Sequence, residues 1–241
     1  MKNAILFGAT SEIGAALIDQ YCALEEWRIV RAGSYLHGVE EQVEVDLVMN
    51  WEKVQPIEDF ASQEIADLEF DFVVISLGYL PGTDLQTAGS EIVRSTFANF
   101  LWPLLCLEFM ENKKLVQDSG VVVVVSSALV ALPPTRKSYF YTILKSSLES
   151  AISNGIRFGF FGSNIIFLRP GFVPTKINQH LSPGKFATTP TEVAKETIRK
   201  IKHGKRSGVV YAPSKIVTLI FLSKFLPLRF RRWVLSLLQK S

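Results

Sequence analysis

Cysteine is scarce in this sequence. The 241 residues include two cysteines, Cys22 and Cys106, which lie far apart in the chain. Two isolated cysteines match neither the paired spacing of a metal site nor the framework of a disulfide-bonded domain. We therefore expect two buried, reduced thiols, no metal site and a cytoplasmic setting.

The sequence also lacks a recognisable signal peptide and a long apolar run near its C-terminus. Met1-Lys2-Asn3 leads directly into "AILFGAT", so we expect a form that is not exported through the Sec route. The apolar stretch at 216–226 has eleven residues, whereas a helix needs roughly 20 to span a bilayer. With 48% hydrophobic residues and a mean hydropathy of +0.22, the chain can still bury a large core.

Acidic residues are absent from Thr197 to the C-terminus, where eleven lysines and arginines occur. The preceding residues carry 15 basic and 23 acidic side chains, a net charge of −8, so the overall +3 hides an asymmetry. An acidic body with a basic end predicts an anionic partner for the C-terminal segment.

No internal repeat, low-complexity segment or linker interrupts the first 204 residues. Apolar stretches typical of buried strands alternate with helical spacing, which predicts a doubly wound parallel sheet in one α/β, Rossmann-type domain at 1–212. An amphipathic helical extension is predicted at 213–241. The predicted strands are 3–7, 27–32, 43–47, 70–78, 120–127, 163–168 and 208–213, and the predicted helices are 11–24, 57–68, 90–112, 138–159 and 189–204.

A glycine-containing turn, "GATSEIG", lies between the first strand and its helix. Glycines let the backbone approach a pyrophosphate, and the helix start offers N–H groups to it. A tight turn without a ligand is the alternative, and Thr10 and Ser11 either bind phosphate or cap the helix. The candidate cofactor contacts here are Gly8, Thr10, Ser11, Glu12, Ile13 and Gly14.

Asp46, at the end of the third strand, is a candidate acceptor for an adenine amino group, or else a solvated strand-end aspartate. After the second strand, an acidic residue would favour NAD and an arginine NADP. The sequence there is "RAGSY", with Arg31 and Ser34 and no Asp or Glu, so both cofactors stay open.

Tyr141 stands four residues before Lys145, which places both side chains on one face of a helix. An ammonium beside a phenol stabilises the phenolate, so we expect the pKa of Tyr141 to be lowered and the pair to transfer a proton near neutral pH. A helix surface that happens to carry aromatic residues is the alternative.

The order of these motifs resembles the short-chain dehydrogenase/reductase family. The resemblance covers residues 1 to about 212 and includes "GATSEIG", Asp46, Asn99, "VVVVVSS", "YTILK" and "RPGFVPT". It implies that Tyr141 donates a proton to a substrate carbonyl and that Lys145 binds the nicotinamide ribose. It further implies that Ser127 binds the substrate oxygen and that Asn99 holds a water in a proton relay. The implied nicotinamide contacts are Gly78, Pro170, Gly171, Val173 and Thr175, with residues 176–189 as a lid.

The sequence departs from the family pattern in two places. Residues 75–78 are Ile-Ser-Leu-Gly, where the family often has Asn-Asn-Ala-Gly, so only Gly78 fits. Ser127 precedes Tyr141 by fourteen residues, one more than is common, which keeps Ser126 as a lesser candidate. Tyr139 lies outside the motif, and we expect it to have a packing role.

The C-terminal segment "SKIVTLIFLSKFLPLRFRRWVLSLLQKS" is unusual for the family. Its basic, amphipathic pattern predicts a helical pair on an anionic membrane surface, on the inner face of the cell membrane. Packing on the body or on a second subunit is the alternative. Interleaved apolar residues argue against nucleic acid as a partner.

Within the family, the sequence is similar to the ketoreductase partner of decaprenylphosphoryl-ribose epimerisation. The similar stretches are "GATSEIG", "VVISLGYLPG", "RPGFVPTKI" and "GKRSGVVYAPSKI". This resemblance implies NAD(P)H-dependent reduction of the 2-keto sugar of a polyprenyl-phosphate pentose, with a partner oxidase and a homo-oligomer as further expectations. The alternatives are reduction of another ketone, such as a lipid or steroid, and a non-catalytic dinucleotide-binding scaffold.

Overall fold

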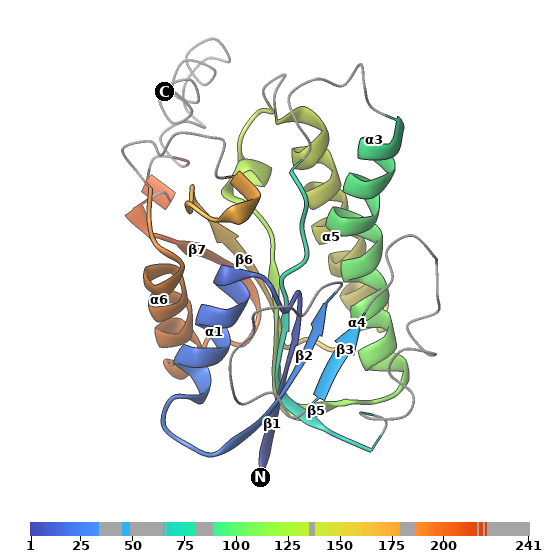
Figure 1. Ribbon diagram of the computed structural model, residues 1–241, viewed down its shortest axis with the longest axis vertical. Helices are drawn as coiled ribbons and strands as arrows, with labels where there is room; N and C mark the ends of the chain where they lie inside the picture. The colour runs from blue at the N-terminus through green and yellow to red at the C-terminus, as the bar shows by residue number, and fades with distance from the viewer. Residues whose placement is uncertain are drawn as a thin grey trace.

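Seven parallel strands form one sheet in the described part of the chain, in the spatial order β3-β2-β1-β4-β5-β6-β7 (Figure 1). The structure is a computed structural model that describes residues 1–33, 45–48 (main chain only), 65, 67–80, 89–134, 138–178, 187–215, 217, 218 and 220. The predicted doubly wound parallel sheet is confirmed. The strands are β1 Lys2–Phe7, β2 Trp27–Gly33, β3 Val45–Val48, β4 Phe70–Ile75, β5 Val116–Val125, β6 Ile165–Pro170 and β7 Gly208–Ala212.

The strand order reverses between β1 and β4. From β1 the chain runs outward to β2 and β3, and it then returns to place β4 on the other side of β1, with Phe7 opposite Ile75. In such sheets, ligands bind in the crevice outside the carboxyl ends of the strands at the point of reversal. The turns that follow Phe7 and Ile75 therefore mark the position of the candidate site.

Helices cover both faces of the sheet (Figure 1). The helices α1 (Glu12–Cys22) and α6 (Pro190–Lys202) pack side by side on one face, and α3 (Gly89–Thr96), α4 (Trp102–Asn112) and α5 (Tyr139–Arg157) cover the other. Successive residues of β1 point into opposite cores: Leu6 packs in the core under α1 and α6, and Phe7 in the core under α4 and α5. Because both faces are covered, the strands are continuously apolar, as parallel strands typically are.

The helix predicted at 90–112 is present, but a π-helical turn at Phe97–Leu101 divides it into α3 and α4. Within this turn, the N–H of Trp102 bonds to the carbonyl of Phe97, five residues earlier. Pro103 has no N–H to give to the carbonyl of Asn99, and its ring would crowd that carbonyl. The proline therefore accounts for the widened turn, in which Asn99 lies.

Cys22 and Cys106 are buried free thiols, as predicted. Burial raises the pKa of the Cys22 thiol to about 12, and burial also raises the pKa of Cys106. Both side chains therefore serve as small apolar residues of the two cores.

Several predictions lie wholly or largely outside the described residues. These are the helix at 57–68, most of the lid at 176–189, Ser34 and the C-terminal segment beyond residue 220. The boundary between a domain at 1–212 and an extension at 213–241 stays a prediction, although β7 does end at Ala212 and residues 215, 217, 218 and 220 are helical.

Candidate active site

The glycine turn after β1 fits tightly against the end of β4. Gly8 has a φ of +101°, and a Cβ placed on it would lie 2.4 Å from the carbonyl oxygen of Ser76. A Cβ on Gly14 would lie 2.6 Å from Cδ1 of Leu6. Gly8 is therefore required by the turn itself, which brings the start of α1 to the crevice, and Gly14 lets α1 pack closely on β1.

The start of α1 could hold an anion. Ser11 caps the helix by accepting the N–H of Gly14 at 3.1 Å, while Thr10 is exposed beside it. The first N–H groups of a helix have no intrahelical partner and carry the positive end of its dipole. Glu12 and Ile13 are the first helical residues, so their main chain offers the groups that would bind a pyrophosphate.

Tyr141 lies in the first turn of α5, and its phenol is hydrogen-bonded to the hydroxyl of Ser127. Ser127 follows β5 closely, and its Oγ accepts the N–H of Leu129 at 3.2 Å. This contact leaves the serine proton available to Tyr141 or to a substrate oxygen. Ser126, by contrast, donates to Glu149, so Ser127 is the serine beside Tyr141.

Lys145 is 2% exposed and lies against the ends of two strands. Its Nζ donates to the carbonyl of Leu77 at 2.9 Å and to the carbonyl of Val125 at 3.1 Å. Burial lowers the pKa of Lys145 to about 8, and the negative charge of Glu149 opposes this effect. An ammonium has three N–H donors, so one donor remains beyond these two carbonyls.

Gly78 is where three parts of the candidate site meet. A Cβ on Gly78 would lie 3.3 Å from Oδ1 of Asn99, 3.6 Å from Cδ1 of Ile177 and 3.7 Å from Nζ of Lys145. The amide of the fully buried Asn99 accepts the N–H of Tyr79 at 3.3 Å and donates to its carbonyl at 2.6 Å. The Asn99 side chain therefore positions the chain after β4, and its water contact stays a prediction.

The turn after β6 reaches back to α1. The N–H of Lys176 donates to the Glu12 carboxylate at 2.8 Å. Asn178 closes this turn by accepting the N–H of Thr175 at 2.9 Å and by donating to the carbonyl of Val173 at 2.8 Å. Glu12 thus joins the start of α1 to the turn that carries the predicted nicotinamide contacts.

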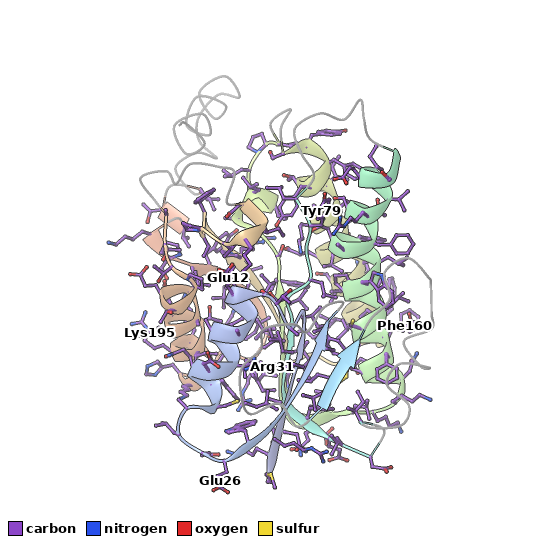
Figure 2. All side chains as sticks on the ribbon, in the orientation of Figure 1. Glu12, Glu26, Arg31, Tyr79, Phe160 and Lys195 are labelled. Atoms are coloured by element: carbon purple, nitrogen blue, oxygen red, sulfur yellow. The ribbon has the colours of Figure 1, made fainter. Side chains whose placement is uncertain are left out.

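The remaining predicted residues lie at the same end of the sheet. Pro170 ends β6, and the N–H of Gly171 donates to the carbonyl of Ala212 at 3.0 Å. Asp46 lies on β3 opposite Arg31 of β2, with only its main chain described. Figure 2 labels two landmarks at this end, Glu12 at the start of α1 and Tyr79 beyond β4.

Two expectations are wrong. Burial raises the pKa of Tyr141 to about 12, against the hydrogen bond from Ser127, so the expected lowering by Lys145 is not found. Helical spacing indicates the nearby charge of Lys145, but it does not indicate the desolvation of the phenolate, which raises the pKa of Tyr141. Tyr139 has no buried packing role, because its side chain is 52% exposed.

Sequence reasoning missed three polar residues that support the site. Ser76 lies behind the glycine turn, and Glu149 lies one turn after Lys145. Tyr79 donates to the carboxylate of Glu91, while the guanidinium of Arg94 lies 4.5 Å from its ring. A serine directly after an apolar strand and a glutamate on the buried face of a helix were the available signals.

The chain after β7 returns to the loop that carries Ser127. Ile220 is 4% exposed and packs with Ala128 and Leu132, and Ala128 begins the 3₁₀ turn that follows Ser127. At the start of this segment, the Glu196 carboxylate of α6 accepts the N–H of Ser214 at 3.0 Å. No helix among the described residues is long and apolar enough to cross a bilayer.

No family model matches the chain. A stretch of 106 residues, 43% of the chain, is 29% identical to an uncharacterized oxidoreductase of Mycobacterium tuberculosis. That stretch covers 41% of the relative, so the chain matches about two fifths of the length of this curated protein.

Solved structures resemble the chain over most of its length. A short chain dehydrogenase from Burkholderia cenocepacia, in complex with NADP, has a TM-score of 0.75 and 15% identity over 98% of this chain and 99% of that one. An alcohol dehydrogenase from the archaeon Thermococcus sibiricus, complexed with 5-hydroxy-NADP, has a TM-score of 0.67 and 22% identity over 88% and 95%. A short chain dehydrogenase family protein from Francisella tularensis has a TM-score of 0.69 and 16% identity over 88% and 97%. The chain therefore has the fold of the short-chain dehydrogenases.

Proposed function

We propose that this protein is an NAD(P)H-dependent carbonyl reductase. The observation that carries the proposal is the contact of Ser127 with the phenol of Tyr141, one helical turn from the buried Lys145. The partial relative is an oxidoreductase, and two of the similar structures are dehydrogenases that bind NADP or 5-hydroxy-NADP. These comparisons support the same class of reaction.

The residues around the crevice fit a dinucleotide. The turn at Gly8 leaves no space for a side chain and presents the start of α1, where a pyrophosphate is stabilised. Gly78 is exposed and carries no side chain over Lys145, whose remaining N–H suits a ribose hydroxyl. When bound, a reduced nicotinamide supplies the hydride.

The chain's own residues would supply the proton and steady the substrate oxygen. With a pKa of about 12, the Tyr141 phenol keeps its proton at neutral pH and can give it to the oxygen of a developing alkoxide. Ser127 would donate a hydrogen bond to the same oxygen. Lys145, one turn further along α5, would hold the nicotinamide ribose with its remaining N–H.

The test is single-turnover oxidation of NADH and of NADPH by the wild type and by Tyr141→Phe, with a ketone substrate. We expect Tyr141→Phe to lose turnover and to bind the cofactor almost as the wild type does, because the phenol contributes the proton. Comparison of the two cofactors identifies the preferred one. Turnover retained in the variant would refute the role of Tyr141.

The specific ketone that we propose is the 2-keto sugar of a polyprenyl-phosphate pentose, which the protein would reduce at a membrane surface. The similar sequence stretches support this substrate, and the basic, apolar C-terminal segment suits a lipid phosphate. The burial of Ile220 against Ala128 supports it too, because that contact brings the start of this segment to the loop that carries Ser127. A partner oxidase would supply the keto sugar.

Two measurements test the substrate. Competition between the keto sugar with and without its polyprenyl phosphate should show that reduction depends on the phosphate-linked lipid; equal rates would favour another ketone. Deletion of residues 221–241 should abolish binding to anionic vesicles, and unchanged binding would refute the membrane proposal. Tight cofactor binding without reduction of any ketone would favour the non-catalytic scaffold.

A further inference from the structure

A buried ion pair lies directly behind the candidate site. Glu149 is 6% exposed and sits one turn after Lys145 on α5. Arg169 of β6 donates through Nε to Oε1 of Glu149 at 2.9 Å and through Nη2 to Oε2. Ser126 donates to the same carboxylate, and Nη1 of Arg169 donates to the Tyr211 phenol at 2.6 Å. The Glu149 carboxylate is therefore held by β6 and by the residue that follows β5.

Each partner of Glu149 is adjacent to a residue of the candidate site. Ser126 precedes Ser127, and Arg169 precedes Pro170 at the turn with the predicted nicotinamide contacts. A buried ion pair is by itself weak evidence for stability, because desolvation of two charges offsets much of their attraction. The position of this pair beside Lys145 points to an effect on that lysine.

We propose that Glu149 is a positioning residue for the proposed reaction, because its charge keeps the Lys145 ammonium protonated and bonded to the carbonyls of Leu77 and Val125. This inference rests on the proposed function. Glu149 and Lys145 share a face of α5, four residues apart, and the glutamate's charge acts on the lysine. Arg169 lies on the other side of the carboxylate and fixes its place.

Few other charges face this lysine within the described chain. Burial favours the neutral amine, so a buried ammonium needs a compensating charge or several acceptors. The titratable and charged groups around Lys145 are Tyr141 and Glu149 from α5 and, behind Glu149, Arg169 from β6. The other side chains that lie with Lys145 around Gly78, Asn99 and Ile177, are uncharged. Glu149 is thus the acidic group in this set.

The experiment is an NMR titration of the full chain labelled with ¹³C at the ε-carbon of lysine, with no cofactor or ketone present. Lys145→Arg identifies the Lys145 signal by its loss. We expect a midpoint near pH 8 in the wild type, consistent with the pKa of Lys145. In Glu149→Gln we expect a midpoint lower by about one pH unit, the usual size of the effect of one nearby charge. Equal midpoints in these two proteins would overturn the proposal.

Two control variants separate the charge effect from a structural one. Arg169→Gln breaks the same ion pair but keeps the carboxylate, so its midpoint should lie above that of the wild type, and a lower midpoint would overturn the proposal. Tyr211→Phe keeps both charges and should leave the midpoint unchanged. If Glu149→Gln fails to fold, the direction in which the Lys145 midpoint shifts in Arg169→Gln tests the proposal alone.

The turnover of the same variants provides a second readout. Glu149→Gln should retain reduction at pH 6 and lose about fivefold at pH 8, as a one-unit shift of the midpoint from 8 to 7 requires. A loss by the same factor at every pH would indicate a structural role and overturn the proposal. The titration needs no reaction. If the protein is not a carbonyl reductase, turnover is absent but the midpoint still shifts in Glu149→Gln. If Glu149 has no effect on Lys145, the midpoints are equal whether or not the protein reduces a ketone.

Discussion

The Oγ atoms of Ser11 and Ser76 lie 2.7 Å apart, and this contact joins the start of α1 to the end of β4. The main chain of Ser76 takes part as well, because its N–H donates to the carbonyl of Phe7 at 2.8 Å and its own carbonyl faces Gly8. The glycine turn is therefore shaped against β4, and its geometry depends on residues that are far apart in the sequence.

Gly8→Ala should disrupt this turn. The added Cβ would lie 2.4 Å from a carbonyl oxygen, at a φ of +101° that side chains rarely adopt. We expect a loss of at least about 2 kcal/mol in the free energy of unfolding, measured in urea, and weaker NADPH binding, measured by fluorescence.

Gly89→Ala is the matched control, because a Cβ there meets no described atom within 4 Å and Gly89 is the first residue of α3. Gly89→Ala should leave the free energy of unfolding unchanged or raise it by up to about 1 kcal/mol. Equal losses in the two variants would contradict the tight fit at Gly8.

Ser127→Ala should lower kcat for ketone reduction roughly 10²–10³-fold, the range for a lost donor to a developing oxyanion. Cofactor affinity should hardly change, because Ser127 contacts Tyr141 and lies outside the glycine turn. Ser126→Ala keeps the Tyr141 contact and loses only a bond to Glu149, so kcat should fall far less. A larger loss in Ser126→Ala would transfer the role to that serine.

The rate of reduction should depend on pH through Lys145. Its pKa is lowered from 10.5 to about 8, so the folded protein loses this positive charge above about pH 8, well before a free lysine would. The phenol of Tyr141, with a pKa of about 12, stays protonated throughout this range. We therefore expect reduction to be nearly constant from pH 6 to 7 and to fall as the pH rises through 8.

The reverse reaction should show the opposite trend. Oxidation of an alcohol needs the phenolate as a base, and the raised pKa of Tyr141 makes that form rare at neutral pH. Its rate should therefore increase with pH. Steady-state rates in both directions, corrected for protein unfolding at each pH, test this pair of expectations, and a reduction rate that rises through pH 8 would contradict them.

Most of the fold could be predicted because its signals are local. Buried parallel strands are continuous apolar runs, as at Val121–Val125 of β5, and helix starts carry capping residues. Ser11 caps α1, and Thr189 forms a capping box with Glu192 at the start of α6. The spacing of Tyr141 and Lys145 likewise predicted their shared helix.

The electrostatics of the site could not be predicted in the same way. Desolvation of Tyr141 depends on which residues cover the phenol, and helical spacing does not contain that information. The contacts Ser11–Ser76 and Glu149–Arg169 join residues 65 and 20 positions apart, across different strands and helices. Such pairs become visible only when the strand order is known.

Ile220→Asp should impair the reaction, although Ile220 is not one of the candidate catalytic residues. A carboxylate cannot stay buried against Ala128 and Leu132, so the start of the C-terminal segment should leave the loop that follows Ser127. We expect KM for a soluble ketone to rise about tenfold, which corresponds to about 1.4 kcal/mol. Val217→Asp is the control, since Val217 is 40% exposed on the same segment, and it should keep the wild-type KM. Equal KM values in both variants would show that the Ile220 contact does not shape the substrate side of the site.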